Sequence, residues 1–386
     1  MDSYRSQFPA LANKSYFNYG GQGPIPQAAL AAISTAYQDI QTLGPFGLKT
    51  SEWVIKESNL TRQAIASELG VVAETITLTE NVTVGCNIAL WGIDWQPGDE
   101  ILLSDCEHPG VIASIKEVCR RFGVSVNLFP LLATLNSGDP VEAIVSNLTP
   151  RTRLVVFSHV LWNTGQVLPL AEISARIKQY TQAEHEIQIL IDGAQSVGLI
   201  PLQLAELGVD FYAFTGHKWW CGPEGVGGLY VHPDAIARLH PTFIGWRGLD
   251  YSQSDLPLVD NGRRYEVATS AYPLYCGLRA AISTHQAWGS SINRAAKIVE
   301  LATYLWKGLQ QVSGIKCLSE TAPRSGLVSF QSALGNHGKL VKALEDKHFY
   351  LRTIVDPDCI RACTHYFTTT AEIDDLIINL NSLSKS

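Results

Sequence analysis

The chain has 386 residues, of which 46% are hydrophobic and 17% charged, and its formal net charge is −7. A chain of this length can bury a large core, and we expect one large domain with a smaller one attached. The acidic balance gives no reason to expect a nucleic acid or an anionic membrane surface as a partner. No apolar run reaches the roughly 18–20 residues that cross a bilayer, and the N-terminal residues lack the pattern of a secretory signal.

The eight cysteines are scattered along the chain and form no CxxC pair. This spacing argues against a disulfide scaffold, so we expect a cytoplasmic protein whose thiols stay reduced. The sequence also has no HExxH motif, no cysteine and histidine cluster with the spacing of a zinc site, and no GxSxG motif. We therefore expect no metal centre and no serine-hydrolase site.

Between residues 70 and 235, short apolar runs alternate with segments of helical spacing, such as 111–122 and 170–180. Seven of the runs are predicted to be buried strands: 76–79, 100–104, 124–129, 152–158, 187–192, 210–216 and 226–231. Continuous apolar strands that alternate with amphipathic helices are typical of an α/β fold, in which helices cover both faces of a mainly parallel sheet.

The second half of the chain departs from this alternation. Residues 248–268 are polar and rich in turn formers, and helical spacing resumes over 270–311. The remainder predicts a compact α+β domain, with strands at 327–332, 349–355 and 359–363 and helices at 338–347 and from 370. We expect an N-terminal segment (1–20) that packs with the small domain, a large domain (21–265), and a linker helix with the small domain (266–386).

Three polar segments each follow a predicted strand. Asp192 ends one strand, Lys218 lies just past another, and the segment TENVT (79–83) ends a third and opens a helix. Because the carboxyl ends of parallel strands meet at one edge of a sheet, we expect the three segments to lie close together.

These segments supply what pyridoxal phosphate (PLP) chemistry needs. A lysine amine forms an imine with the aldehyde, a carboxylate keeps the pyridine nitrogen protonated, and a helix N-terminus binds the phosphate. Taken singly, each has a plainer interpretation: Asp192 as a turn former, Lys218 as a surface lysine, and TENVT as an ordinary helix cap. Their combination in this order is a much narrower pattern and favours PLP.

The segments FNYGGQG (17–23), DGAQ (192–195) and TGHK (215–218) resemble those of the fold-type I PLP enzymes. The resemblance is to the class V aminotransferase family, which includes the cysteine desulfurases, and is strongest to its cystine (cysteine) C–S lyase branch. It extends along most of the chain. It implies the fold of the fold-type I PLP-dependent transferases, with a large PLP-binding domain and a smaller α+β C-terminal domain.

The resemblance also implies roles for residues around the cofactor. Lys218 would form the internal aldimine and then remove the Cα proton, and Asp192 would pair with the pyridinium nitrogen. Gln195 would donate to the phenolate oxygen, and His108 would stack on the pyridine ring. The phosphate-binding set would consist of Val82 (through its backbone), Thr83, Thr215, His217 and, from the neighbouring subunit, Thr269. The last assignment implies a homodimer with shared active sites.

Two arginines match positions that hold the substrate in this family. Arg361, in CIRAC, would hold the α-carboxylate with its planar fork. Arg352 lies close by in the sequence, so the pair would suit a substrate with two carboxylates; a surface salt bridge is the alternative for each. Asn163 matches a position that contacts substrate or cofactor. We expect aromatic residues to line the side-chain pocket: Tyr19, Trp246 and Tyr366.

One departure from the desulfurases concerns sulfur chemistry. Those enzymes carry a nucleophilic cysteine a few residues after an RTG motif, which corresponds here to Arg352–Thr353. The expected position falls near Pro357, and the nearest thiol, Cys359, begins a predicted strand. We therefore expect β-elimination from cystine or cysteine, giving pyruvate, ammonia and a persulfide or sulfide. A persulfide leaves more easily than a thiolate because a sulfur of lower pKa is the better leaving group.

Two alternatives stay open. A desulfurase that uses Cys359 would yield alanine and an enzyme persulfide. A non-catalytic partner protein in sulfur or iron–sulfur cluster assembly would have no physical need to keep Lys218, Asp192 and Gln195 together. A sulfur-acceptor or iron–sulfur scaffold protein is a further expected partner of the enzyme.

Overall fold

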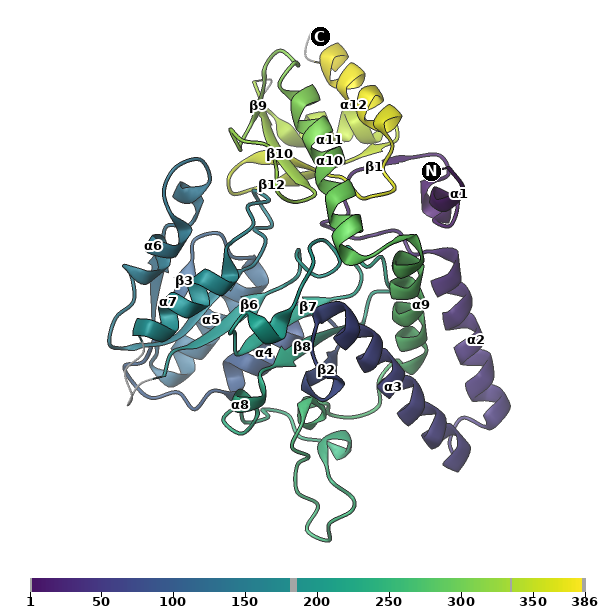
Figure 1. Cartoon of the computed structure of the whole chain (residues 1–386), viewed down its shortest axis with the longest axis vertical. Helices are drawn as coiled ribbons and strands as arrows, with labels where there is room; N and C mark the ends of the chain where they lie inside the picture. The colour runs from purple at the N-terminus through teal and green to yellow at the C-terminus, as the bar shows by residue number, and fades with distance from the viewer. Residues whose placement is uncertain (1, 181–185, 334, 384–386) are drawn as a thin grey trace.

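The computed structural model describes residues 2–180, 186–333 and 335–383. Figure 1 shows a large region built around a central sheet, and above it a smaller region that contains the C-terminal helix α12 (Thr370–Leu383). Among the described residues, no helix is long and apolar enough to cross a membrane. No group of three side chains that could hold a metal ion occurs among them either.

The central sheet has seven strands in the order β2-β8-β7-β6-β5-β3-β4. Five consecutive strands run parallel to one another: β7, β6, β5, β3 and β4. Strand β8 is antiparallel to both of its neighbours, β7 and β2. Their bounds are Ile76–Thr79 (β2), Glu100–Ser104 (β3), Ser125–Phe129 (β4), Thr152–Ser158 (β5), Gln188–Asp192 (β6), Phe211–Thr215 (β7) and Gly227–Val231 (β8). The predicted mainly parallel sheet is confirmed.

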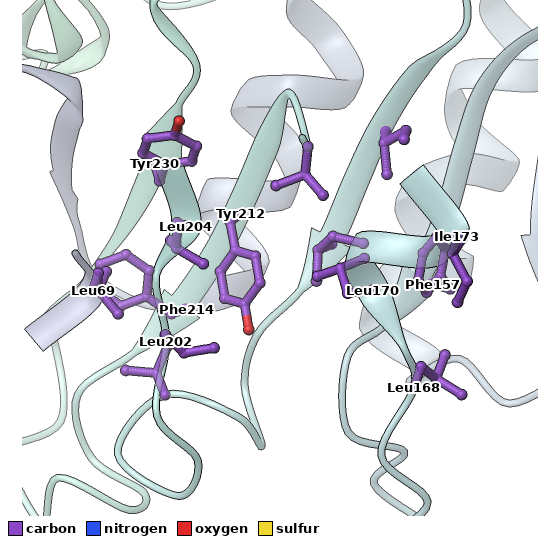
Figure 2. Close-up of a cluster of buried hydrophobic side chains, with 14 of the residues drawn as sticks. Leu69, Phe157, Leu168, Leu170, Ile173, Leu202, Leu204, Tyr212, Phe214 and Tyr230 are labelled. Atoms are coloured by element: carbon purple, nitrogen blue, oxygen red, sulfur yellow. The ribbon is translucent and has the colours of Figure 1, made fainter. Parts of the chain in front are cut away.

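Both faces of this sheet are buried, as continuous apolar strands require. Along β5, Val155 and Phe157 belong to one hydrophobic cluster, and Leu154 and Val156 belong to another on the opposite face. Figure 2 shows part of the first cluster, in which Phe157 lies beside Ile173 of α7. Because side chains alternate across a strand, a polar substitution at any of these four positions would enter one of the two cores.

Helices cover the two faces of the sheet. The first cluster receives side chains from α3 (Leu48–Leu69), α6 (Pro140–Val145), α7 (Leu170–Tyr180) and α9 (Tyr272–Trp288). The second receives side chains from α4 (Val82–Gly92), α5 (Pro109–Phe122) and α8 (Pro233–Ile236). Helix α2 (Gln27–Leu43) packs along α9, and α1 (Asp2–Arg5) lies near α12 (Figure 1).

One strand prediction needs correction. The run 124–129 was expected to be a buried strand, but β4 is the edge strand of the sheet. Val126 and Leu128 are 39% and 58% exposed, and only Phe129 at the end of the strand is fully buried. Its apolar composition resembles that of the central strands, so position in the sheet, rather than composition, decides its exposure.

The smaller region has a four-stranded antiparallel sheet in the order β12-β13-β10-β9. Its strands are β9 (Ile315–Cys317), β10 (Leu327–Ser332), β12 (Arg352–Ile354) and β13 (Cys359–Cys363), and its helices are α10 (Ser291–Leu309), α11 (His337–Glu345) and α12. The predicted strand 349–355 is divided in two. Its first part, β11 (Phe349–Tyr350), pairs instead with β1 (Ser15–Tyr16) in a parallel ribbon. The N-terminal segment is thus hydrogen-bonded to the smaller region.

The helical stretch 270–311 forms two helices. Helix α9 packs on α2 and α3, whereas α10 packs on α12, β10 and β9. Ser290 caps α10 by accepting a hydrogen bond from Asn293 N–H at 3.2 Å. We therefore propose that the two domains divide near Gly289, with α9 belonging to the large domain rather than to the smaller one.

Candidate active site

The active-site candidates gather at the edge where the parallel strands end. Asp192 ends β6 beside Ser158, the last residue of β5, and Ala213 of β7. Lys218 lies three residues beyond Thr215, which ends β7. The opposite charges of Asp192 and Lys218 act on each other, since each shifts the pKa of the other toward its charged form. The structure therefore brings the predicted carboxylate and lysine together.

Burial shifts the protonation equilibrium of the Lys218 amine. Desolvation lowers the pKa of its amine to about 8, and the charge of Asp192 offsets part of that shift. The charges of Arg361 and Arg352 lower the pKa further. An amine with such a pKa is partly neutral near pH ~7, which a nucleophile toward an aldehyde requires.

Asp192 is a buried carboxylate with a 4% exposed fraction. Its Oδ1 accepts a hydrogen bond from Ala194 N–H at 2.8 Å. Burial raises the pKa of Asp192, and the charge of Lys218 lowers it. Among the described residues no lysine, arginine or histidine forms an ion pair with it, so this carboxylate lacks the close cationic partner that buried charges usually have.

The N-terminus of α4 lies at the same edge. Asn81 caps the helix, because its Oδ1 accepts a hydrogen bond from Val84 N–H at 3.1 Å. The N–H groups of Val82 and Thr83 belong to the first turn and have no acceptor within the helix, which makes this terminus suitable for an anion. Thr83 lies close to the start of α5, where a Cβ placed on Gly110 would meet Thr83 Oγ1 at 3.4 Å.

Two further predicted phosphate ligands contact each other. Thr215 Oγ1 lies 2.6 Å from His217 Nδ1. Burial lowers the pKa of His217 to about 4, so the imidazole is neutral near pH ~7. A neutral imidazole hydrogen-bonded through Nδ1 to a hydroxyl can still use its Nε2 for an anion if that nitrogen carries the proton.

His108 stands at the start of α5. Its Nδ1 accepts a hydrogen bond from Gly110 N–H at 3.2 Å, which leaves the proton of the neutral ring on Nε2. Burial and the charge of Lys218 lower the pKa of His108. Its ring meets that of Trp162 edge-on, with 5.4 Å between the centroids. Stacking on a cofactor ring stays a prediction for this residue.

Gln195 joins two segments at the site. Its Nε2 donates to Gly20 O at 2.8 Å, and its Oε1 accepts from Trp219 Nε1–H at 3.0 Å. A primary amide has two N–H groups, so one remains for the predicted bond to a phenolate oxygen.

Arg361, on β13, is completely buried, with an exposed fraction of 0%. Its Nη1 donates to Trp162 O at 2.7 Å, and its Nη2 lies 3.4 Å from Asn18 Oδ1. Its Nε is buried and has no partner. Among the described residues no carboxylate forms an ion pair with this guanidinium, so its positive charge is uncompensated. Desolvation of the nearby Arg352, together with the charge of Arg361, lowers the pKa of Arg352.

Asn163 is also buried, at 3% exposure, and its Nδ2 donates to Asp356 O at 3.1 Å. Its Oδ1 is buried without a partner. The amide thus links the large region to the turn between β12 and β13 and keeps one acceptor free, although a substrate contact stays a prediction.

The predicted aromatic residues lie in two separate places. Tyr19 is fully buried in a cluster with Trp219 and Phe367, and Tyr366 O–H lies 2.7 Å from His285 Nδ1. Trp246 is 50% exposed and lines a separate small pocket. Their burial and positions favour packing roles for the two tyrosines, and their contact with substrate stays untested.

Thr269 is exposed and lines a pocket of about 620 Å³ that Thr83 also lines. Lys218 and Asp192 are not among the residues around this pocket. Phe243 lines it too and is 75% exposed. In Figure 1 the segment between α8 and α9 extends downward, away from the sheet. Thr269 thus lies beside an exposed apolar side chain and beside the first turn of α4, to which Thr83 belongs.

Sequence reasoning missed Glu107, which precedes His108. Its carboxyl group is 4% exposed and accepts hydrogen bonds from Ser158 N–H at 2.8 Å and Ser158 Oγ at 2.9 Å. Burial, together with the charge of Asp192, raises its pKa to about 8. Glu107 therefore fastens the His108 loop to the end of β5. Its position next to His108 in the sequence is the signal that could have identified it as part of the site.

A pair of buried histidines was also missed. His365 Nε2 lies 3.1 Å from Trp219 O, and His285 Nε2 lies 2.8 Å from Trp220 O. Burial lowers the pKa of both imidazoles. They hold the backbone that directly follows Lys218. No local motif marks them, because their partners lie far away in the sequence.

Cys359 is fully buried in β13, and burial raises the pKa of its thiol to about 12. A thiol with that pKa holds very little thiolate near pH ~7. It begins β13 and pairs with Ile354 of β12, so it lies in a strand rather than in a loop. The structure therefore offers no support for a nucleophilic role of Cys359.

This fold, with its lysine and carboxylate at the carboxyl edge of the sheet, defines a transferase-type α/β enzyme of fold-type I. The chain matches the aminotransferase class-V family over residues 15–374 and belongs to that family. The resemblance inferred from its motifs is confirmed.

Solved structures and curated proteins are similar along the whole chain. A complex of the cystine C–S lyase C-DES with its product cysteine persulfide is 50% identical, with a TM-score of 0.94, over 97% of this chain and 99% of that one. Isopenicillin N epimerase from Streptomyces clavuligerus is 27% identical, over 97% of this chain and 96% of its own length. A cysteine desulfurase from Klebsiella pneumoniae is 26% identical, over 100% of this chain and 98% of its own length.

Proposed function

We propose that the protein is a PLP-dependent carbon–sulfur lyase that acts on L-cystine or L-cysteine by β-elimination. One observation carries the proposal. A buried anion, Asp192, and a buried cation, Arg361, both lack a close charge partner within the described part of the chain and lie near the same lysine, Lys218. The cofactor ring and the substrate carboxylate would supply the two missing charges. The similarity to C-DES over nearly the full length supports the choice of substrate.

The residues present fit PLP. Asp192 would hold the protonated ring nitrogen, and the N-terminus of α4, with Thr83, Thr215 and His217, would hold the phosphate. Lys218 would hold the aldehyde carbon. When bound, PLP supplies a ring that accepts the electron pair released at the substrate Cα.

Lys218 is suited to take the Cα proton. Its amine, once free, has a lowered pKa and can hold a proton and release it near neutral pH. Arg361 would hold the α-carboxylate, and His108 would cover the ring. Because the guanidinium is completely buried in this structure, one of the groups that cover it has to move before the carboxylate can bind.

The fate of sulfur follows from Cys359. Since that thiol is buried and protonated, it is not available to accept the sulfur, and the Cβ–S bond would break with its electron pair leaving on sulfur. L-cystine and water then give cysteine persulfide, pyruvate and ammonia. From L-cysteine the sulfur product is sulfide.

We also propose a homodimer with shared active sites, in which Thr269 reaches the phosphate of the neighbouring subunit. Its exposure beside an apolar surface supports this arrangement. A sulfur-acceptor or iron–sulfur scaffold protein would receive the persulfide. The eight cysteines form no disulfide with one another, which is in keeping with the cytoplasmic location that we propose.

The proposal is tested by incubating the PLP-loaded protein with L-cystine and identifying the products. We expect pyruvate and cysteine persulfide in equal amounts. Alanine in place of pyruvate would show desulfurase chemistry and contradict the lyase assignment. Recovery of unchanged cystine from the loaded protein would contradict the enzyme assignment as a whole.

A further inference from the structure

The N-terminal loop 17–23 crosses the site and is fixed there by its backbone. It is fastened at three points: Phe17 O accepts from Cys363 N–H at 2.7 Å, Gly20 O accepts from Gln195 Nε2 at 2.8 Å, and Gly23 N–H donates to His217 O at 2.7 Å. Between the first two points stands Asn18, whose carbonyl oxygen accepts from Gly21 N–H at 2.8 Å. The backbone at Asn18 is therefore held in a defined position.

The loop backbone lies directly against Arg361. A Cβ placed on Gly20 would lie 2.9 Å from both Cζ and Nη2 of that guanidinium, closer than real Cβ atoms approach. A side chain at this position would push the guanidinium away. Glycine at position 20 thus permits the close approach that brings Asn18 to Arg361.

Among the described residues, the hydrogen bonds of Arg361 leave its Nε–H unused. A guanidinium has five N–H donors in a fixed planar fork. Nη1 donates to Trp162 O, and one N–H of Nη2 faces Asn18 Oδ1, so both ends of the fork are held by neutral oxygens. Nε is buried and has no partner. In any guanidinium the Nε–H and the adjacent N–H of Nη2 form a side-on edge, which matches the two oxygens of a carboxylate.

We propose that Asn18 is a positioning residue for the substrate α-carboxylate. Its amide oxygen steadies Arg361 with the Nε–Nη2 edge presented to the substrate, and it leaves the guanidinium charge uncompensated because the amide is neutral. An aspartate of the same size would pair with Arg361 and compete with the substrate. This inference rests on the proposed function, since it requires an amino-acid substrate bound beside Lys218.

The experiment measures binding rather than turnover. The PLP-loaded wild-type protein and its Asn18→Asp and Asn18→Ala variants are titrated with glycine and with glycinamide, which lacks the carboxylate. The visible absorption of the bound cofactor reports binding. We expect Asn18→Asp to weaken glycine binding about tenfold or more and to leave glycinamide within about twofold. Asn18→Ala should weaken glycine binding by about threefold, because it removes the hydrogen-bond acceptor of Arg361 Nη2 without adding a charge.

With L-cystine as substrate, the same variants should raise KM and leave kcat nearly unchanged, because Asn18 acts on binding of the ground state and the transition state alike. Wild-type affinity for glycine in Asn18→Asp would overturn the inference. An equal loss of affinity for glycine and glycinamide would also overturn it, because the substitution would then disturb the site as a whole rather than the carboxylate contact. A wild-type protein that binds glycine no better than glycinamide would instead contradict the proposed function of Arg361, and the inference with it.

Discussion

The two halves of the candidate site are built in different ways. The cofactor half is assembled from strand ends and helix starts, and its central pair, Asp192 and Lys218, lies within one stretch of the large region. The carboxylate half joins Asn18, Trp162 and Arg361, which come from the N-terminal loop, the large region and the smaller region. Local sequence motifs therefore specify the first half, whereas only tertiary packing completes the second.

This difference has a consequence for mutation. A change in the cofactor half removes a group that takes part in the chemistry, and its effect should fall on kcat or on the cofactor itself. A change in the carboxylate half should fall on the affinity for the substrate. Substitutions on the two sides can thus be separated by kinetics and by the cofactor spectrum.

The largest effect is expected from Lys218→Ala. This change removes both the covalent anchor and the proposed base, so activity on L-cystine should fall by at least about a thousandfold. The visible absorption band of the lysine-linked cofactor should disappear as well. A Lys218→Ala protein that keeps this band would contradict the assignment of the anchor.

A smaller effect is expected from Arg361→Lys. Lysine keeps the charge but loses the planar fork, so KM for L-cystine should rise about tenfold to a hundredfold while kcat changes less. Steady-state kinetics with the PLP-loaded variant measure both constants. An unchanged cofactor spectrum is the control, and a fall in kcat with an unchanged KM would place Arg361 in the other half of the site.

Glu107 provides a test of electrostatics that is independent of turnover. Its pKa is raised from 4.5 to about 8 in the folded protein. The folded state therefore favours the protonated acid, and the stability that this contributes is present below pH ~4.5 and is lost as the pH rises toward ~8. Glu107→Gln keeps hydrogen-bonding partners for Ser158 but cannot ionise, so it should gain stability relative to wild type over this range, by at most a few kcal/mol near pH ~8.

Thermal unfolding midpoints of the PLP-loaded proteins, measured near pH ~5 and pH ~8, check this prediction. The difference between Glu107→Gln and wild type should be small at the lower pH and larger at the higher one. A difference that is the same at both values would show that Glu107 is ionised throughout. Glu107→Ala is the comparison that removes the bonds to Ser158, and it should be destabilised at both pH values.

The smallest effect is expected from Cys359→Ala. Because the thiol is buried and protonated, its loss should leave the rate of pyruvate formation from L-cystine within about twofold of wild type. The matched control is Cys317→Ala, which removes a buried thiol from β9 of the same sheet. Loss of activity in Cys359→Ala alone would favour the desulfurase alternative.

Much of this molecule could be predicted from its sequence because local patterns carry strong physical constraints. All seven predicted strands of the central sheet occur, since short apolar runs differ clearly from the amphipathic helices between them. The exposure of β4 and the division of 349–355 at Leu351 depend on which strand lies next in space, and the sequence pattern holds no information on that.

The site shows the same contrast. Asp192 and Lys218 were found because each ends a strand in a recognisable segment. Asn18 contacts Arg361, and His285 contacts the backbone of Trp220, which follows Lys218 closely. In each case the two partners are more than 60 positions apart in the chain. Hydrogen bonds of that kind leave no local spacing, so they emerge only from the folded structure.

The central claim is that the two buried, unpaired charges belong to one ligand assembly, Asp192 with the cofactor and Arg361 with the substrate. A crystal structure of the PLP-loaded protein with glycine tests it most directly. We predict a carboxylate oxygen of Asp192 within hydrogen-bond distance of the pyridine nitrogen, and the glycine carboxylate on the Nε–Nη2 edge of Arg361. A pyridine nitrogen that faces any other group, or a glycine carboxylate bound away from Arg361, would contradict the account.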